Sequence, residues 1–218
     1  MNEFSDARQY APATQRNREP ILEVLLQVLP PKGTVLEVSS GTGEHAVFFA
    51  RRLQPRKWIP SDPNPVARAS ITAWQKHCPA DNLYPAIALD ACDRIWAVEQ
   101  DELPEPLQDI DFHRNPIVAI VNINTIHIAP WSACLGLMAG ARRILPSGGI
   151  LYLYGPFKQA GKHTAASNAD FDQSLRTQNP EWGVRDLEDV VAEAQAQQLS
   201  LVKTYTMPAN NLSVIFQA

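Results

Sequence analysis

The amino-acid sequence predicts an α/β fold with a doubly wound, mostly parallel sheet. Three observations lead to this prediction. Short β-branched runs alternate along the chain with segments whose apolar residues recur at helical spacing. A turn of small residues, 39–43, joins one such run to one such segment and opens a βαβ unit. Two alternating segments near the C-terminus, 201–207 and 212–216, predict a hairpin that adds an antiparallel element at one edge.

Helices are predicted where apolar side chains share one face. Ile21, Leu25 and Leu29 do so over 18–29, and the prolines that follow end this helix. Asp186 is expected to cap a later helix, because a carboxylate can accept the free N–H groups of a first turn. The other helices are predicted over 44–53, 66–74, 131–145 and 170–176, and after residue 186.

Strands are predicted where apolar, β-branched residues run together. The run Ile117–Val121 contains no polar residue, which is typical of a central strand covered on both faces. The segment 95–116 is acidic and contains prolines, so a short helix and a surface loop are expected there. The other strands are predicted over 35–38, 58–61, 83–89, 150–154, 201–207 and 212–216.

A chain of 218 residues is long enough for one domain, which we expect to span 1–218. The N-terminal arm, 1–17, shows no periodic pattern. It is expected to be either a poorly ordered tail or a flap over a pocket. In the second case Tyr10, Arg16 and Asn17 are the side chains that would contact a ligand.

The composition, with 45% hydrophobic and 19% charged residues, is that of an ordinary soluble globular protein. The net charge of −4 offers no electrostatic reason to expect a nucleic-acid partner. Cys78, Cys92 and Cys134 show no metal-ligand spacing, so reduced thiols in the cytoplasm and no metal site are expected. The N-terminus lacks the features of a signal peptide, and no apolar run is long enough to span a membrane.

An acidic residue lies at the end of each of the first three predicted strands: Glu37, Asp62 and Asp90. In doubly wound sheets, ligands bind outside the carboxyl ends of the strands. Carboxylates accept hydrogen bonds, so these three suit a ligand with an amine, a ribose diol and an exocyclic amine. S-adenosylmethionine carries all three groups. Asp62 is then expected to bind the ribose hydroxyls, Asp90 the adenine amine, and Glu37 the methionine ammonium.

The glycine pattern by itself also suits a nicotinamide cofactor. Residues 41–46 fit G-x-G-x-x-A, and Asp62 lies about 20 residues further on, where a ribose-binding acid is expected. Glu37 favours the first interpretation, because its charge would repel a pyrophosphate and attract an ammonium or a sulfonium. No lysine or arginine directly follows the glycines to meet a phosphate, which excludes a P-loop.

Seven motifs resemble those of a known family, and together they cover nearly the whole chain. They are RNREPIL at 16–22, VLEVSSGTGEHA at 35–46, PSD at 60–62, YGPF at 154–157, NADFD at 168–172, NPEWGVRD at 179–186 and MPANN at 207–211. The chain resembles the class I, Rossmann-like S-adenosylmethionine-dependent methyltransferases. More narrowly, it resembles the family that includes methyltransferase-like protein 26, long described as a domain of unknown function, and the last three motifs are specific to it.

This resemblance implies a seven-stranded sheet with the strand order 3-2-1-4-5-7-6 and S-adenosylmethionine as the cofactor. It does not indicate the methyl acceptor. Ser39 departs from the family pattern, since methyltransferases usually carry the first glycine of their E-x-G-x-G-x-G motif there. Its hydroxyl is expected close to the ligand. The complete set of expected cofactor-binding residues is Arg16, Asn17, Glu37, Ser39, Gly41, Thr42, Gly43, Asp62, Asp90 and Asn122.

His127 is the candidate general base, because its ordinary pKa is near neutral and it follows the central strand, where it is expected to face the pocket. The alternative is a histidine that only hydrogen-bonds a loop. Asn124 is a second candidate catalytic residue. Like Asn122, it either binds cofactor or acceptor or belongs to ordinary turn chemistry. His45 is expected beside the cofactor or in packing. The candidates for the acceptor side, which line a pocket or pack loops, are Tyr154, Phe157, Trp182, Asn210 and Asn211.

The sequence therefore predicts an S-adenosylmethionine-dependent methyltransferase that acts on a small molecule. Two other functions stay open: an NAD(P)-dependent oxidoreductase, and a non-catalytic protein that binds S-adenosylmethionine. No membrane partner is expected, and the sequence does not indicate an oligomeric state.

Overall fold

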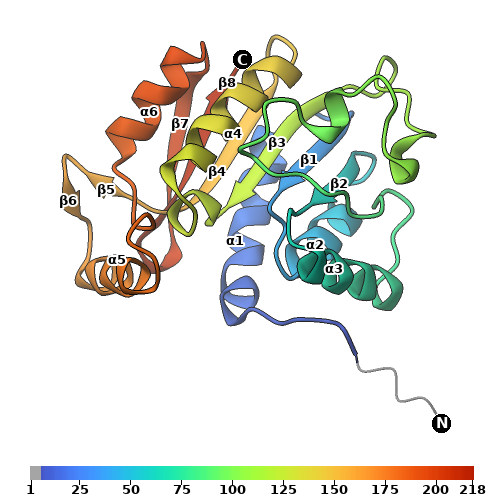
Figure 1. Cartoon of the computed structure of the whole chain (residues 1–218). Helices are drawn as coiled ribbons and strands as arrows, with labels where there is room; N and C mark the ends of the chain where they lie inside the picture. Colours follow the sequence, from blue (N-terminus) through green and yellow to red (C-terminus); the bar gives the residue numbers. More distant parts are fainter. Residues whose placement is uncertain (1–5) are drawn as a thin grey trace.

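A computed structural model describes residues 6–218, and within these residues six strands form one sheet in the order β2-β1-β3-β4-β8-β7 (Figure 1). The first four strands of that order are parallel, whereas β8 lies antiparallel between β4 and β7. The predicted α/β fold with a C-terminal antiparallel hairpin is therefore confirmed. The strands are β1 (Thr34–Val38), β2 (Lys57–Ser61), β3 (Ile117–Ile123), β4 (Ile150–Pro156), β7 (Ser200–Met207) and β8 (Asn211–Gln217).

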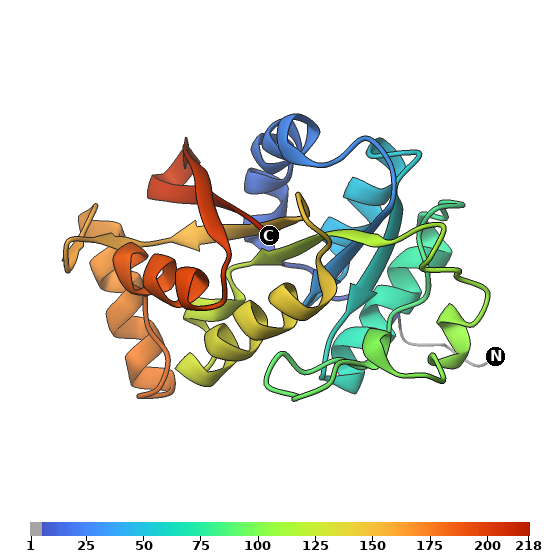
Figure 2. The same cartoon turned by 90° about the horizontal axis from the view of Figure 1, so that it is seen from above.

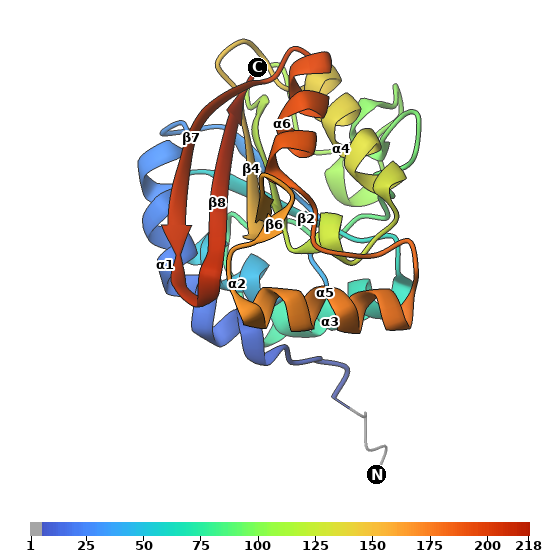
Figure 3. The same ribbon diagram turned by 90° about the vertical axis from the view of Figure 1, so that its left-hand side faces the viewer.

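Helices cover both faces of the sheet (Figure 2). Side chains of α1 and α2 form one apolar core with β1, β3 and β4, and those of α4 and α6 form the other. Figure 3 shows α5 lying across the lower end of the strands. The helices are α1 (Pro12–Val28), α2 (Glu44–Arg52), α3 (Pro65–His77), α4 (Trp131–Ile144), α5 (Ala166–Gln178) and α6 (Leu187–Ala196).

The third predicted strand, 83–89, does not form a regular strand, so the sheet has six strands where seven are predicted. The segment does lie beside β2, in the place the predicted order assigns to it, through two parallel bridges, Trp58 with Leu83 and Ser61 with Ile87. Pro85 stands between them and has no N–H to donate, which interrupts the ladder.

The first helix begins at Pro12, earlier than the predicted residue 18, and it continues through Pro20. The predicted arm is therefore extended only over 6–11, and residues 1–5 lie outside the described part of the chain. A proline is tolerated in the first turn of a helix because its missing N–H has no partner there, which suits Pro12.

Three further differences concern connecting segments. The helix predicted over 170–176 is longer than expected and spans all of α5. A short hairpin precedes it, formed by β5 (Lys158–Gln159) and β6 (Lys162–His163). The segment 95–116 contains two short 3-10 turns, at Ala97–Glu99 and Glu105–Leu107.

The cap predicted at Asp186 is confirmed, since its side chain accepts the N–H of Glu188. None of the helices in residues 6–218 combines the length and apolar character needed to cross a bilayer.

Gly43 is required by packing between helices. It adopts φ +88° at the start of α2, and a Cβ there would lie 2.8 Å from the Cα of Ile71 in α3. We expect Gly43→Ala to lower the free energy of unfolding by about 1–3 kcal/mol, through strain and overpacking together. Thermal unfolding measures the change. Gly161→Ala is the control, because Gly161 has φ +72° but open space around a Cβ. Equal losses in the two variants would contradict the packing explanation.

Candidate functional site

A cavity of about 570 Å³ opens at the carboxyl ends of β1, β2 and β3. Its wall contains Glu37, Asp62 and Asp90, the three carboxylates that follow successive strands or strand-like segments. Because parallel strands end at one edge of the sheet, residues separated by more than fifty positions meet here. The remaining wall residues are Ala11, Ala13, Thr14, Asn17, Ser39, Ser40, Gly41, Thr42, His45, Pro63, Ala91, Cys92, Ile123, Asn124, Thr125, Ile128, Ala129, Pro130 and Ala133.

The turn after β1 presents backbone to this cavity. Ser39 adopts φ +59° and Gly41 φ +57°, both in the left-handed region. Nothing lies within 4 Å of a Cβ built on Gly41, so the chain is open to a ligand at that point. Ser39 holds the strained conformation at the position where the family motif has a glycine. Gly43, by contrast, is not on the cavity wall, and its conformation serves the contact with α3.

Asp62 holds this turn against the end of β2. Its Oδ2 accepts the N–H of Gly41 at 3.0 Å, and its Oδ1 accepts the N–H of Asn64 at 2.9 Å. Each carboxylate oxygen can accept more than one hydrogen bond, so the buried Asp62 retains capacity for a ligand. Its position and partners suit a pair of hydroxyl groups.

Glu37 is buried in β1, with 2% of its surface exposed. Its Oε2 accepts the indole N–H of Trp58 at 2.8 Å. Burial raises the pKa of Glu37 to about 7 and the nearby Asp62 adds to the rise, while hydrogen bonds from Trp58 and Ser40 oppose it. A buried carboxylate that is costly to ionise would be stabilised by a cation placed beside it.

Asp90 differs from the other two acids because it is exposed. Its Oδ1 accepts the N–H of Cys92 at 2.9 Å, which organises the loop after the strand-like segment 83–89. Asp90 therefore lies at the rim of the cavity, whereas Glu37 and Asp62 lie deep inside.

The N-terminal segment forms another part of the wall. Glu44 accepts the N–H of Ala11 at 2.6 Å, Ser70 accepts that of Gln9 at 2.8 Å, and the indole of Trp74 donates to the carbonyl of Gln9. These bonds fasten 9–11 to α2 and α3, so that the first turns of α1 reach the cavity. Asn17 lies on the wall and is buried, but Arg16 is exposed and does not line the cavity.

Glu44, Ser70 and Trp74 were not among the predicted site residues. Glu44 could have been identified from the sequence, since an acid in the first turn of a helix is a common partner of free N–H groups. No local pattern identifies Ser70 and Trp74, because they form hydrogen bonds with a segment some sixty residues away in sequence.

Two of the predicted polar residues after β3 have different positions. Asn122 is buried and donates from Nδ2 to the carbonyl of Val38 at 3.0 Å, so it ties β3 to β1 and does not line the cavity. Asn124 does line the cavity. It adopts φ +65°, which asparagine tolerates better than most residues, and its N–H donates to the carbonyl of Tyr154.

His127 does not face the cavity, contrary to the prediction. It is fully buried, and its ring packs edge-to-face on Phe157 with centroids 4.9 Å apart. Its Nδ1 accepts the N–H of Arg185 at 3.2 Å, so the ring proton is on Nε2. Burial, together with the Arg185 cation, lowers the pKa of His127 to about 3 although Asp172 opposes this. Because His127 lies off the cavity wall and its Nδ1 already accepts a hydrogen bond, it is not placed to take a proton from a bound acceptor.

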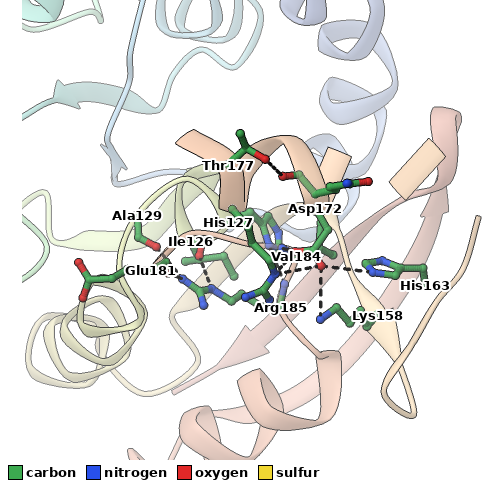
Figure 4. A network of polar contacts seen from close by, with 12 residues as sticks. Ile126, His127, Ala129, Lys158, His163, Asp172, Thr177, Glu181, Val184 and Arg185 are labelled. Carbon is green, nitrogen blue, oxygen red and sulfur yellow. Dashed lines mark hydrogen bonds and ion pairs between the residues drawn. The ribbon is translucent and has the colours of Figure 1, made fainter. Parts of the chain in front are cut away.

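Arg185 fixes the loop that carries several wall residues (Figure 4). Its Nε donates to the carbonyl of Ile126 at 2.9 Å and its Nη2 to that of Ala129 at 2.6 Å. The backbone next to Arg185 is held in turn by Asp172, which accepts the N–H of Val184 at 2.7 Å. Sequence reasoning missed the two bonds from Arg185 to this loop, because each connects segments more than fifty residues apart.

The five residues predicted for the acceptor side lie off the cavity wall. Tyr154 and Phe157 are buried in the two apolar cores. Trp182 is half-buried in the loop before Arg185. Asn210 is exposed in the hairpin turn, and Asn211 donates to the carbonyls of that same turn. Packing and turn chemistry account for these positions.

The described wall residues give the cavity a negative character. They include three carboxylates and no lysine or arginine. Its one histidine, His45, is neutral, because burial and the nearby Arg18 lower its pKa to about 3. The arrangement suits a ligand that carries a cation and several hydrogen-bond donors, and it opposes a phosphate.

Solved structures with this fold include several methyltransferases, all of low sequence identity. An O-methyltransferase family 2 protein from Planctomyces limnophilus, in complex with apigenin, has a TM-score of 0.75 at 18% identity, and the match covers 100% of this chain and 62% of that one. An O-methyltransferase family protein from Burkholderia thailandensis gives 0.70 at 15%, covering 94% and 57%. Human N-acetylserotonin methyltransferase in complex with SAM gives 0.71 at 13%, covering 94% and 52%.

These likenesses show that the chain has the Rossmann-like methyltransferase fold, and that it spans about 52–62% of the length of those three proteins. A family model described as "Protein of unknown function (DUF938)" matches residues 8–218, nearly the whole chain. The protein therefore belongs to the DUF938 family.

Proposed function

We propose that this protein is an S-adenosylmethionine-dependent methyltransferase. The observation that carries the proposal is the meeting of Glu37, Asp62 and Asp90 around one cavity at the strand ends. The fold shared with methyltransferases supports it. The narrower relation to the methyltransferase-like protein 26 family, inferred from the motifs, is part of the proposal.

The three carboxylates can accept hydrogen bonds from the three donor groups of this cofactor. Asp62 would bind the ribose hydroxyls, Asp90 at the rim the adenine amine, and Glu37 the ammonium of the methionine part, directly or through water. The open backbone at Gly41 would let the ligand lie close to the turn. Ser39, Thr42, Asn17 and Asn124 are the other polar side chains placed to contact it.

S-adenosylmethionine supplies a methyl group on a positively charged sulfur, with an uncharged thioether as the leaving group. The residues of this chain would bind and orient the two reactants and exclude water, which is the main contribution that such a displacement requires. The buried carboxylate of Glu37 would also attract the cationic ligand into the cavity.

The acceptor is proposed to be a small molecule. The cavity is compact, and one solved structure of the same fold contains apigenin. Cys78, Cys92 and Cys134 are all free thiols, which suits the reducing cytoplasm as the place of action. Neither an oxidoreductase nor a binding protein without activity is favoured by any feature of the cavity, and Glu37 disfavours a pyrophosphate.

Ligand binding tests the cofactor directly. S-adenosylhomocysteine at about 100 times its Kd should stabilise the protein by about 2.7 kcal/mol, measured as a thermal shift, whereas NADH should produce none. A shift with NADH and none with S-adenosylhomocysteine would show that the cofactor is wrong. Binding without methyl transfer to any small molecule of a labelled metabolite pool would favour the non-catalytic function.

Asp62 is expected to carry much of the binding energy. Asp62→Ala should weaken S-adenosylhomocysteine binding by about 10- to 100-fold, because it removes charged hydrogen-bond acceptors and releases the turn at Gly41. Isothermal titration calorimetry measures the Kd. Asp81→Ala, at an exposed acid outside the cavity, is the control and should bind like the wild type. Unchanged affinity in Asp62→Ala would contradict the assignment.

Glu37 should make both stability and affinity depend on pH. Its pKa is raised to about 7 in the folded, ligand-free protein, so its contribution to stability is greatest below its ordinary pKa of 4.5 and is lost as the pH rises through 7. Glu37→Gln keeps an acceptor for Trp58 and should remove this loss. It should therefore be the more stable protein at pH 8, as chemical denaturation can show.

Affinity should change in the opposite direction. The ratio of wild-type to Glu37→Gln affinity for S-adenosylhomocysteine should rise by about tenfold from pH 6 to pH 8, as the Glu37 carboxylate ionises to meet the ligand ammonium. Taking the ratio removes the titration of the ligand itself. A ratio independent of pH would mean that Glu37 does not face the cation.

A further inference from the structure

His45 connects the first turn of α2 to the cavity wall. Its Nε2 lies 2.8 Å from Oδ1 of Asn17 in α1. An amide oxygen only accepts hydrogen bonds, so Nε2 is the protonated nitrogen of the ring. One face of the imidazole stacks on Phe49, with centroids 5.3 Å apart and planes 4° from parallel. The ring is therefore fixed both in orientation and in tautomer.

The other ring nitrogen, Nδ1, is an unprotonated acceptor without a partner. It makes no hydrogen bond with any residue of 6–218. Unlike Nε2 of His127, which is also without a partner, Nδ1 of His45 is not fully enclosed by protein atoms. Since His45 lines the cavity, Nδ1 remains open to a ligand there. The lowered pKa of His45, about 3, keeps this lone pair free at every physiological pH.

Asn17 is itself fixed. It is buried and lines the same cavity. Side chains of α1 and α2 thus fix the ring that carries Nδ1.

The three hydrogen-bonding groups of S-adenosylmethionine considered above already have partners in the proposed site. Under the proposed function, the diol, the adenine amine and the ammonium belong to Asp62, Asp90 and Glu37. An acceptor nitrogen in the same cavity is then available for the second reactant. Its partner must carry a hydrogen on the attacking atom, which an ionised carboxylate lacks.

We propose that Nδ1 of His45 accepts a hydrogen bond from the attacking group of the methyl acceptor, and that this group is an uncharged hydroxyl, thiol or amine rather than a carboxylate. The inference rests on the proposed function. Asn17 acts through His45 as a positioning residue, since it holds the tautomer that leaves Nδ1 free.

Sinefungin tests the inference without knowledge of the acceptor. In this analogue a carbon that bears an amine replaces the methylated sulfur, so a hydrogen-bond donor occupies the place of the transferred methyl group. It can reach His45 directly or through the water that replaces the attacking group. His45→Phe, which keeps the stacking on Phe49, should weaken sinefungin binding by about tenfold more than it weakens S-adenosylhomocysteine binding.

His113→Phe, at an exposed histidine away from the cavity, is the matched control and should leave both affinities unchanged. Equal effects of His45→Phe on the two ligands, or no effect on either, would overturn the inference. Failure of the wild type to bind S-adenosylhomocysteine would instead overturn the proposed function, so the two failures are distinguishable.

A measurement on the wild type avoids any effect of substitution on folding. In ¹⁵N spectra of the imidazole nitrogens, His45 should carry its proton on Nε2 in the free protein. Sinefungin should shift the Nδ1 resonance, and S-adenosylhomocysteine should leave it in place. Asn17→Ala should allow both tautomers. A proton on Nδ1 in the free protein, or an Nδ1 resonance insensitive to sinefungin, would contradict the inference.

Discussion

The candidate site depends on one contact, between the turn after β1 and the end of β2. The N–H of Ser40 donates to the carbonyl of Ser61 at 2.8 Å, the hydroxyl of Ser61 donates to the carbonyl of Glu37 at 2.8 Å, and Asp62 accepts the N–H of Gly41. Parallel pairing brings the two strand ends to the same edge, and these bonds then hold the turn in its left-handed conformation. Without them the carboxylates of Glu37 and Asp62 would not share a cavity.

The electrostatics of the cavity follow from that contact. Glu37 is enclosed between β2 and the turn, where the Trp58 indole and Ser40 give it polar support, and burial makes its ionisation costly. A fold optimised for stability alone would place an apolar residue there. Retaining a buried acid is consistent with a site that gives up stability in order to bind a cation.

The opposite wall is built by contacts between distant parts of the chain. Arg185 holds the loop after β3 through two carbonyls, and Ser70 and Trp74 hold the segment before α1. The clamp at Arg185 also explains why His127 is unsuited to catalysis, since the histidine is part of the support and has its Nδ1 occupied. His45, whose Nδ1 is free, is the histidine on the cavity wall.

The sequence by itself determined the order of strands and helices, the position of the turn and the acids at the strand ends, because these depend on local periodicity and on a rule of parallel sheets. It could not show which side of the chain a residue after a strand would face, and so His127 and the aromatic candidates were misplaced. The cavity walls, the raised pKa of Glu37 and the fixed tautomer of His45 were decided only by tertiary structure. Each results from burial and from hydrogen bonds between elements that no local pattern connects.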